Sequence, residues 1–229
     1  MEQTCEERVL AVIAELKEGV RVQALPVAQY GRPIGRLEPI TWRDARDDEA
    51  IGQLARSREA ANAFFPSQFP VTVAGTQRWL MQQLLEVPDR LLFWVCGNDG
   101  KRLGHLGLFR FDFKTPTVEI DNVVRGVEGA APGLMTAALE TLLTWSFETL
   151  GMAEIYLRVL SDNVRALWLY ERCGFREAFR VPLARQEEGP VVRWVEVDSS
   201  YRGPVQRYFV SMRLLPGQRQ AARACRQAA

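Results

Sequence analysis

The sequence is poor in the residues that metal and redox sites require. It contains one histidine, His105, and four cysteines, at positions 5, 96, 173 and 225, which are widely scattered. No two cysteines have the short spacing of a zinc knuckle or a redox motif. We therefore expect neither a metal site nor a disulfide framework.

The usual cofactor loops are also missing. No Gly-rich turn follows an early strand, as flavin and nicotinamide sites would require, and no phosphate loop ends in Lys-Ser or Lys-Thr. These absences argue against a dehydrogenase and against a nucleotide hydrolase.

An excess of charge of either sign is lacking as well. The 29 Lys and Arg residues nearly balance the 28 Asp and Glu residues, so the molecule as a whole has no electrostatic reason to bind nucleic acid or an anionic membrane. No apolar run approaches the length of a membrane span, and the start MEQTCEERVL lacks the basic-then-apolar order of a secretory signal. We expect a cytoplasmic protein with no nucleic-acid partner and no membrane partner.

What the sequence does contain is ample material for one core. Its 229 residues are 47% hydrophobic, which suits a single domain with an appended segment. Periodicity and breakers predict helices over 4–18, 42–65, 76–87, 133–150 and 162–172, strands over 91–96, 102–113, 117–124, 154–160, from 175 and over 205–214, and a surface helix or frayed tail over 216–229. Residues 20–39 are compatible with irregular chain or with a strand pair.

This order of elements predicts the fold class. Helices followed by an antiparallel meander and a β-α-β-α-β tail indicate an α/β (α+β) plan, with a mixed, mostly antiparallel sheet flanked by helices and preceded by a helical extension. We expect residues 1–38 to form the N-terminal extension, 39–215 the main domain and 216–229 an Arg- and Ala-rich tail.

The most specific motif lies within the β-α-β-α-β segment, between residues 163 and 175. Asn163, Ala166, Leu169-Tyr170-Glu171 and Gly174-Phe175 fit the pattern N-x-x-A-x-x-L-Y-E-x-x-G-F without a gap. The motif resembles the GNAT superfamily of N-acetyltransferases, in particular its ribosomal-protein-acetylase-like branch. The resemblance covers about residues 40–214, and it implies a GNAT fold, acetyl-CoA as co-substrate and no metal.

In the family, a loop before a helix holds the pyrophosphate of coenzyme A, because free N–H groups and the helix dipole suit a compact anion. Here residues 129–135 occupy the place of the family's Q/R-x-x-G-x-G/A loop. Gly133 matches its first glycine, whereas Ala130 and Met135 depart from it and Pro132 has no N–H to donate.

The resemblance, with these departures, implies a set of residues for coenzyme A. The donors at the start of the helix are Gly133, Leu134, Met135 and Thr136, and Arg125 is our own candidate for the missing positive charge, with a plain surface arginine as the alternative. Main-chain groups near Val123 and Val124 would pair with the pantetheine arm and polarise the thioester carbonyl. Asn163, Ala166 and Tyr170 complete the expected cofactor-binding set, although Asn163 also fits a simple helix cap.

Three side chains compete for the role of base, and one tyrosine fits the acid. Tyr170 stands where the family has the acid that protonates the leaving thiolate; without the motif, core packing would explain it. Glu119 matches the acidic residue of the branch's E-I-G-Y-like strand and is our first candidate for the base. Asp121, on the same strand face, is the second candidate or a clamp for a cationic acceptor, at a place where the family usually has glycine. His105 is the third, with a structural strand histidine as the alternative.

The acceptor is less determined than the donor. By analogy with the branch we expect a primary amine of a protein N-terminus or a small molecule, with an amino sugar or nucleotide-linked amino sugar as the competing acceptor. A non-catalytic CoA-binding module is the alternative from another class. Residues 183–204 are expected to shape the acceptor pocket or to form a plain surface hairpin. The oligomeric state stays open, a homodimer included.

Overall fold

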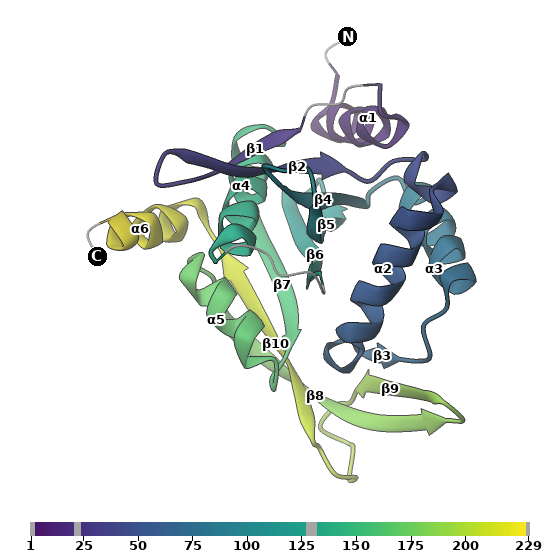
Figure 1. The fold of residues 1–229 in the computed structure, drawn as a ribbon. Coiled ribbons are helices and arrows are strands. Elements are labelled where there is room, and N and C mark those ends of the chain that lie inside the picture. Colours follow the sequence, from purple (N-terminus) through teal and green to yellow (C-terminus); the bar gives the residue numbers. More distant parts are fainter. Residues whose placement is uncertain (1–2, 21–23, 127–131, 228–229) are drawn as a thin grey trace. The chain divides into compact units, whose positions relative to one another are not determined.

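The computed structural model describes residues 3–20, 24–126 and 132–227 (Figure 1). The chain divides into two compact units, Met1–Arg58 with Val71–Ala153 and Glu59–Pro70 with Glu154–Ala229. Each unit is described by itself.

The first unit is built on five strands in the order β1-β2-β4-β5-β6, each antiparallel to its neighbour. Its elements are α1 (Cys5–Glu18), β1 (Leu25–Gln29), β2 (Arg32–Pro39), α2 (Asp48–Ala60, which crosses into the second unit), α3 (Val73–Trp79), β4 (Leu91–Gly97), β5 (Arg102–Asp112), β6 (Thr117–Arg125) and α4 (Leu134–Glu148). The sequence of residues 20–39 was compatible with irregular chain or with a strand pair, and the structure has the strand pair β1–β2 there. Tyr30 and Gly31 make its two-residue turn with positive φ, as a tight hairpin requires.

Local signals explain why the predicted N-terminal helix forms. Thr4 and Glu7 make a reciprocal capping box at the start of α1, and Gly19 ends the helix in the left-handed conformation. The buried residues Val9, Ile13 and Leu16 recur at three- and four-residue steps along one face of the helix.

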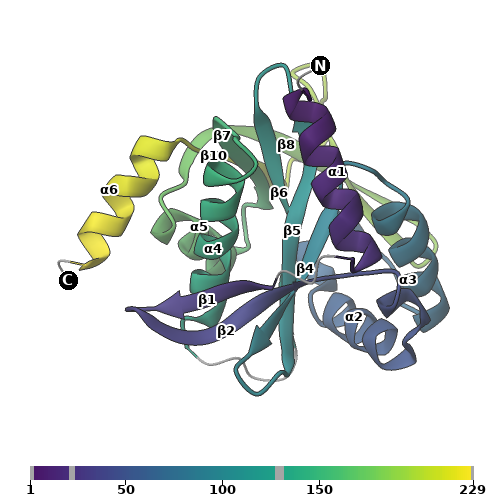
Figure 2. The same cartoon turned by 90° about the horizontal axis from the view of Figure 1, so that it is seen from above.

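Alternating side chains of β4 bury both faces of this sheet. Leu92, Trp94 and Cys96 pack with residues of α2 and of the π-helical continuation of α3, Leu80–Leu85. Phe93, which points the other way, meets Trp145 of α4 edge to face. The first unit thus has three layers, with α1 and α4 over one face of the sheet and α2 and α3 over the other (Figure 2).

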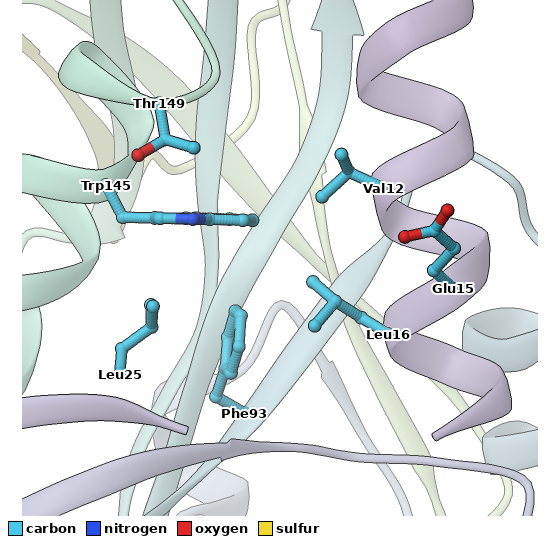
Figure 3. Close-up of a pocket in the computed structure, with 7 residues that line it drawn as sticks. All are labelled: Val12, Glu15, Leu16, Leu25, Phe93, Trp145 and Thr149. Atoms are coloured by element: carbon cyan, nitrogen blue, oxygen red, sulfur yellow. The ribbon is translucent and has the colours of Figure 1, made fainter. Parts of the chain in front are cut away.

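A small cavity of about 100 Å³ lies between α1, α4 and β4. Figure 3 shows Val12 and Leu16 facing Trp145 across it, above Phe93. Its remaining lining residues are Glu15, Leu25 and Thr149. None of the expected site residues lines this cavity, so the candidate site has to be sought elsewhere.

The second unit contains five strands in the order β7-β10-β8-β9-β3, again antiparallel. Its elements are β3 (Ser67–Gln68), β7 (Glu154–Leu160), α5 (Val164–Arg172), β8 (Arg176–Glu188), β9 (Val191–Glu196), β10 (Arg207–Leu214) and α6 (Pro216–Gln227). Leu160, Leu183, Trp194 and Phe209 form a buried cluster in this unit. The segment expected to shape the acceptor pocket is largely the end of β8 and the strand β9, joined in a hairpin around Gly189.

The fold class expected from the sequence is confirmed, because mostly antiparallel strands are flanked by helices. One element differs: in place of one helix over 42–65, α2 spans only Asp48–Ala60, between short 3-10 turns at Asp44–Arg46 and Asn62–Phe64. The carboxylate of Asp44 accepts hydrogen bonds from Thr41 N and Trp94 Nε1, which fixes a turn before the helix can begin. The domain limits at residues 38 and 215 stay a prediction.

Two features are absent from the described part of the chain. No helix there is long and apolar enough to cross a membrane. Among the same residues, no group of three or more His, Cys, Asp or Glu side chains is placed to hold a metal ion.

Candidate active site

Two bulges distort the ladder between β5 and β6. On β6, Asn122 and Val123 stand against the single residue Leu106 of β5, because the register shifts between the pairs His105–Val124 and Gly107–Asp121. Asn122 has φ 49°, in the left-handed region that non-glycine residues seldom occupy. A bulge re-aims side chains and takes main-chain groups out of the ladder. It lies at the place where main-chain groups near Val123 were expected to meet the thioester.

The second bulge is on β5, where Arg110 and Phe111 stand against Val118. Arg110 also has a positive φ, 54°. Its guanidinium Nη1 lies 2.5 Å from Glu119 Oε2 in an ion pair. The carboxylate of Glu119 is 10% exposed and the arginine side chain 51% exposed, so water reaches this pair from the arginine side. Water can therefore compete with Glu119 for the guanidinium.

Asp121 lies on the same face of β6 as Glu119 but has a different environment. Its Oδ2 accepts hydrogen bonds from both Nε and Nη2 of Arg90, each at 2.7 Å, and its Oδ1 accepts from Asn122 Nδ2 at 2.7 Å. Both side chains of the ion pair are mostly buried, 11% exposed for Arg90 and 19% for Asp121. Both carboxylate oxygens are thus engaged within the protein, which suits a structural role better than proton transfer.

The aromatic ring of Phe109 contacts both Arg90 and Arg110. The guanidinium carbon of Arg90 lies 4.6 Å from the Phe109 ring centroid and that of Arg110 lies 5.0 Å from it. Phe109 is the cross-strand partner of Glu119. Each candidate carboxylate therefore has its own arginine, and the face of β6 carries no surplus negative charge from these four side chains.

His105 is buried in the core of the first unit. Its ring packs edge to face against Trp94, and its Nδ1 has no hydrogen-bond partner among the described residues. Burial lowers the pKa of His105 to about 4, so the ring is neutral at physiological pH. A base must reach the proton it removes, and a side chain 3% exposed does so poorly. The structural alternative given for His105 is the better supported one.

The start of α4 was expected to hold the pyrophosphate. Gly133 is its N-cap residue, in the left-handed conformation with φ 85° and with no side-chain cap. This conformation favours glycine, and a Cβ at this position would also press on the flexible end of the Gln29 side chain, 2.4 Å from its Nε2. Because the cap has no side chain, the first N–H groups of α4, on Leu134, Met135 and Thr136, are left for other acceptors.

The rest of the expected cofactor set in this unit has mixed exposure. Arg125, at the end of β6, is exposed and Val123 is half buried, whereas Val124 and Leu134 are buried. Gly129, Ala130 and Ala131, the first part of the expected loop, lie outside the described residues. The described donor set fits an anion in part, because the start of α4 offers N–H groups without a side-chain cap.

In the second unit, the family motif forms α5 and its flanks. Asn163 is the N-cap residue of α5, and its Oδ1 accepts a hydrogen bond from Ala166 N at 3.2 Å. The helix-cap alternative given for Asn163 therefore describes a contact that the structure contains. Tyr170 is buried against Phe175, edge to face with centroids 5.9 Å apart. Phe175 N donates to Tyr170 O, which closes the turn after the helix. Part of the motif is thereby explained by the folding of α5 itself.

Sequence reasoning missed Arg90, Arg110 and the conformation of Asn122. The two arginines belong to no motif, and one of them reaches its carboxylate from 31 residues away in the chain. The one signal that pointed here was Asp121-Asn122 at a place where the resembling family has glycine. The family's glycine corresponds to Asp121, whereas the left-handed conformation belongs to the next residue, Asn122, so this signal did not predict that conformation.

Comparisons with known proteins concern the family and the fold. A family model for the acetyltransferase (GNAT) domain matches residues 36–176. No curated protein matches the chain. A GCN5-related N-acetyltransferase from Brucella melitensis has a similar structure, with TM-score 0.62 and 21% identity over 89% of this chain and 85% of that one.

Two further solved structures are similar. A probable GNAT-family acetyltransferase from Chromobacterium violaceum ATCC 12472 has TM-score 0.63 and 21% identity, over 85% of this chain and 87% of the other. Spermidine N-acetyltransferase from Vibrio cholerae, solved in complex with CoA and spermine, has TM-score 0.60 and 17% identity, over 80% of this chain and 96% of the other. At these identities the structures show the shared fold, while the family model covers more than half of the chain.

The chain therefore belongs to the GNAT acetyltransferase family and is an N-acetyltransferase. Enzymes of this family take the acetyl group from acetyl-CoA. The ribosomal-protein-acetylase-like branch stays a prediction.

Proposed function

We propose that this enzyme transfers the acetyl group of acetyl-CoA to a primary amine of a small molecule or of a protein N-terminus, with Glu119 as the general base. The observation that supports this most is the pair formed by Glu119 and the bulge on β6. A buried carboxylate with a separable partner lies three residues from a distortion that frees main-chain groups. This arrangement suits proton removal beside a polarised carbonyl.

Acetyl-CoA would be held first by its pyrophosphate. The uncapped start of α4 offers N–H groups of Leu134, Met135 and Thr136 together with the positive end of the helix dipole. Arg125 would add charge in place of the basic loop residue that the family uses at position 130. Pro132 contributes no N–H, so this site has fewer donors than the family's own loop.

The chemical step then needs one bond to form and one to break. The amine nitrogen bonds to the thioester carbonyl carbon while the C–S bond breaks. Glu119 takes a proton from the amine, directly or through water, and the Tyr170 hydroxyl gives a proton or a hydrogen bond to the leaving sulfur. The main-chain N–H of Val123 would polarise the carbonyl oxygen.

The charges on β6 favour one kind of acceptor. The spermidine N-acetyltransferase among the similar structures binds a polycation, which points to small amines in general. In this chain, however, Arg90 and Arg110 already neutralise Asp121 and Glu119. We therefore place an acceptor with a single amine, such as an amino sugar or a peptide N-terminus, ahead of a polyamine.

An acceptor screen with thiol release as the readout tests this function. It should include peptides, amino sugars, nucleotide sugars, amino acids and polyamines, with acetyl-CoA as donor. We expect release with at least one monoamine, and a lower kcat in Tyr170→Phe at unchanged acetyl-CoA affinity. Calorimetry that detects no acetyl-CoA binding at millimolar ligand would contradict the proposal, and so would wild-type turnover in Tyr170→Phe.

A further inference from the structure

Asn122 holds a backbone conformation that needs support. Its φ of 49° lies in the left-handed region, where asparagine is tolerated better than most residues because its short polar side chain can form a local hydrogen bond. Here that bond is the one from Asn122 Nδ2 to Asp121 Oδ1 at 2.7 Å. Residues kept in such regions are held by their surroundings and gather at functional sites.

Asp121 is itself held by Arg90. Nε and Nη2 of the guanidinium both donate to Asp121 Oδ2, a charge-assisted contact with defined geometry. The carboxylate thus connects Arg90 on one oxygen with Asn122 on the other. Its orientation is set from both sides.

Arg90 is anchored in turn by the helical segment before β4. Its Nη1 donates to the carbonyl oxygen of Gln83 at 2.8 Å, and its guanidinium lies over the rings of Trp79 and Phe109, at 5.4 and 4.6 Å. Every contact described here involves residues of the first unit. The chain of contacts runs from the end of the α3 segment through Arg90 and Asp121 to the bulge.

We infer that Arg90 is a positioning residue: through Asp121 it holds Asn122 in the left-handed conformation and so aims the main-chain N–H of Val123 at the thioester carbonyl. The inference rests on the proposed function, since it explains how the proposed carbonyl donor is kept in place. It also assigns Asp121 to the positioning of the bulge, leaving Glu119 as the base. Glycine at position 122 would need no such support, because glycine takes positive φ freely.

The test compares two arginine variants that are matched in their contacts. Arg90→Gln breaks the pair with Asp121, whereas Arg102→Gln breaks a similar pair with Asp44, in which the guanidinium lies 4.7 Å from the Trp94 ring. We expect Arg90→Gln to lower kcat by about tenfold to a hundredfold, because small misplacements of a catalytic group have effects of this size. Acetyl-CoA affinity by calorimetry should be largely unchanged. Arg102→Gln should keep the wild-type kcat at a similar loss of melting temperature.

Rescue separates positioning from general stability. Adding Asn122→Gly to Arg90→Gln should restore most of the lost kcat without restoring the melting temperature. The inference is overturned if kcat falls alike in Arg90→Gln and Arg102→Gln, or if the glycine does not rescue a folded double variant. If Arg90→Gln does not fold, Arg90→Lys takes its place, since lysine keeps the charge but cannot form the two-nitrogen contact.

A measurement without substrate distinguishes this inference from the proposed function. In 15N-labelled protein, the amide shifts of residues 119–125 should move in Arg90→Gln and not in Arg102→Gln. Unmoved shifts overturn the positioning role even if the enzyme is active. Moved shifts in a protein that binds no acetyl-CoA would support the contact chain while contradicting the proposed function.

Discussion

Two carboxylates two residues apart on β6 have opposite surroundings. Glu119 pairs with Arg110, whose side chain is half exposed and sits on a bulge of β5. Asp121 pairs with Arg90, whose guanidinium is almost buried and contacts Asp121 through two nitrogens. The same guanidinium donates to the carbonyl oxygen of Gln83 and lies over the rings of Trp79 and Phe109. A partner in contact with water can leave, and a partner held on all sides cannot. We therefore propose different roles for the two acids: Glu119 takes part in proton transfer, while Asp121 maintains the geometry of the bulge.

The largest expected effect is on the base. We predict that Glu119→Gln lowers kcat by about a hundredfold to ten-thousandfold, the usual size of a general-base contribution. Acetyl-CoA binding should stay as in the wild type, because the amide is nearly isosteric and lies on β6, away from the start of α4. Steady-state kinetics with the acceptor from the screen, together with calorimetry, measures both quantities. Equal kcat in Glu119→Gln and the wild type would remove Glu119 from the mechanism.

A smaller effect is expected at the second acid. Asp121→Asn keeps the shape of the side chain but loses the charge that binds Arg90, so we expect kcat to fall by about tenfold to a hundredfold through the bulge. The reduced rate should retain the wild-type dependence on pH, since no titrating group of the reaction is removed. A pH–rate profile that loses one limb in Asp121→Asn, and keeps it in Glu119→Gln, would reverse the two assignments.

The two arginines should differ in stability. We expect Arg90→Gln to lower the free energy of unfolding by about 2 kcal/mol, because it leaves a mostly buried carboxylate without its charged partner. Arg110→Gln should cost less, about 1 kcal/mol, because Arg110 is half exposed and water can take its place beside Glu119. Urea unfolding of both variants at one pH measures the difference. Equal losses would show that the two pairs are equally held.

The last expected effect concerns pH, and it affects how the pH–rate profiles are interpreted. Lys17 is buried and donates to the carbonyl oxygens of Leu85 and Val87, and burial lowers the pKa of its ammonium group to about 8. Between pH 8 and the ordinary lysine value of about 10.5, the unfolded chain binds more protons than the folded one. Stability from Lys17 must therefore rise with pH in that window, with a slope of at most about 1.4 kcal/mol per pH unit.

Lys17→Met isolates this contribution. Burial raises the pKa of Cys96 to about 12, so this thiol acts in the opposite direction once the unfolded thiol ionises. The difference between wild type and Lys17→Met, followed by urea unfolding from pH 7 to 10.5, cancels that contribution. A difference that does not change with pH would mean that Lys17 keeps an ordinary pKa in the folded protein.

The sequence was informative where local signals and the family motif coincide. The N-terminal helix α1, the hairpin of β4 and β5, and the strand Glu154–Leu160 follow from periodicity and turn residues, and the fold class follows from their order. The start of the long helix at Gly133 was also predicted, since glycine and the apolar period meet there.

The site was predicted only in part, because its decisive contacts join residues far apart in the chain. Glu119 and Asp121 were recognised as acids on one strand face, but their arginine partners come from a loop and from a neighbouring strand. The left-handed conformation of Asn122 belongs to a bulge, which inserts one extra residue into a strand at a place that the alternation of side chains did not mark here. His105 was ranked by its ordinary pKa, whereas burial against Trp94 decides its state.

The most direct test of the division between the two acids adds Asn122→Gly to each of their variants and measures kcat with one acceptor. Glycine can hold the bulge without help, but it cannot remove a proton. We predict that Asp121→Asn with Asn122→Gly recovers most of the wild-type kcat, while Glu119→Gln with Asn122→Gly stays as slow as Glu119→Gln alone. Recovery in the Glu119 pair, or no recovery in a folded Asp121 pair, would contradict the assignment of Glu119 as base and Asp121 as the residue that holds the bulge.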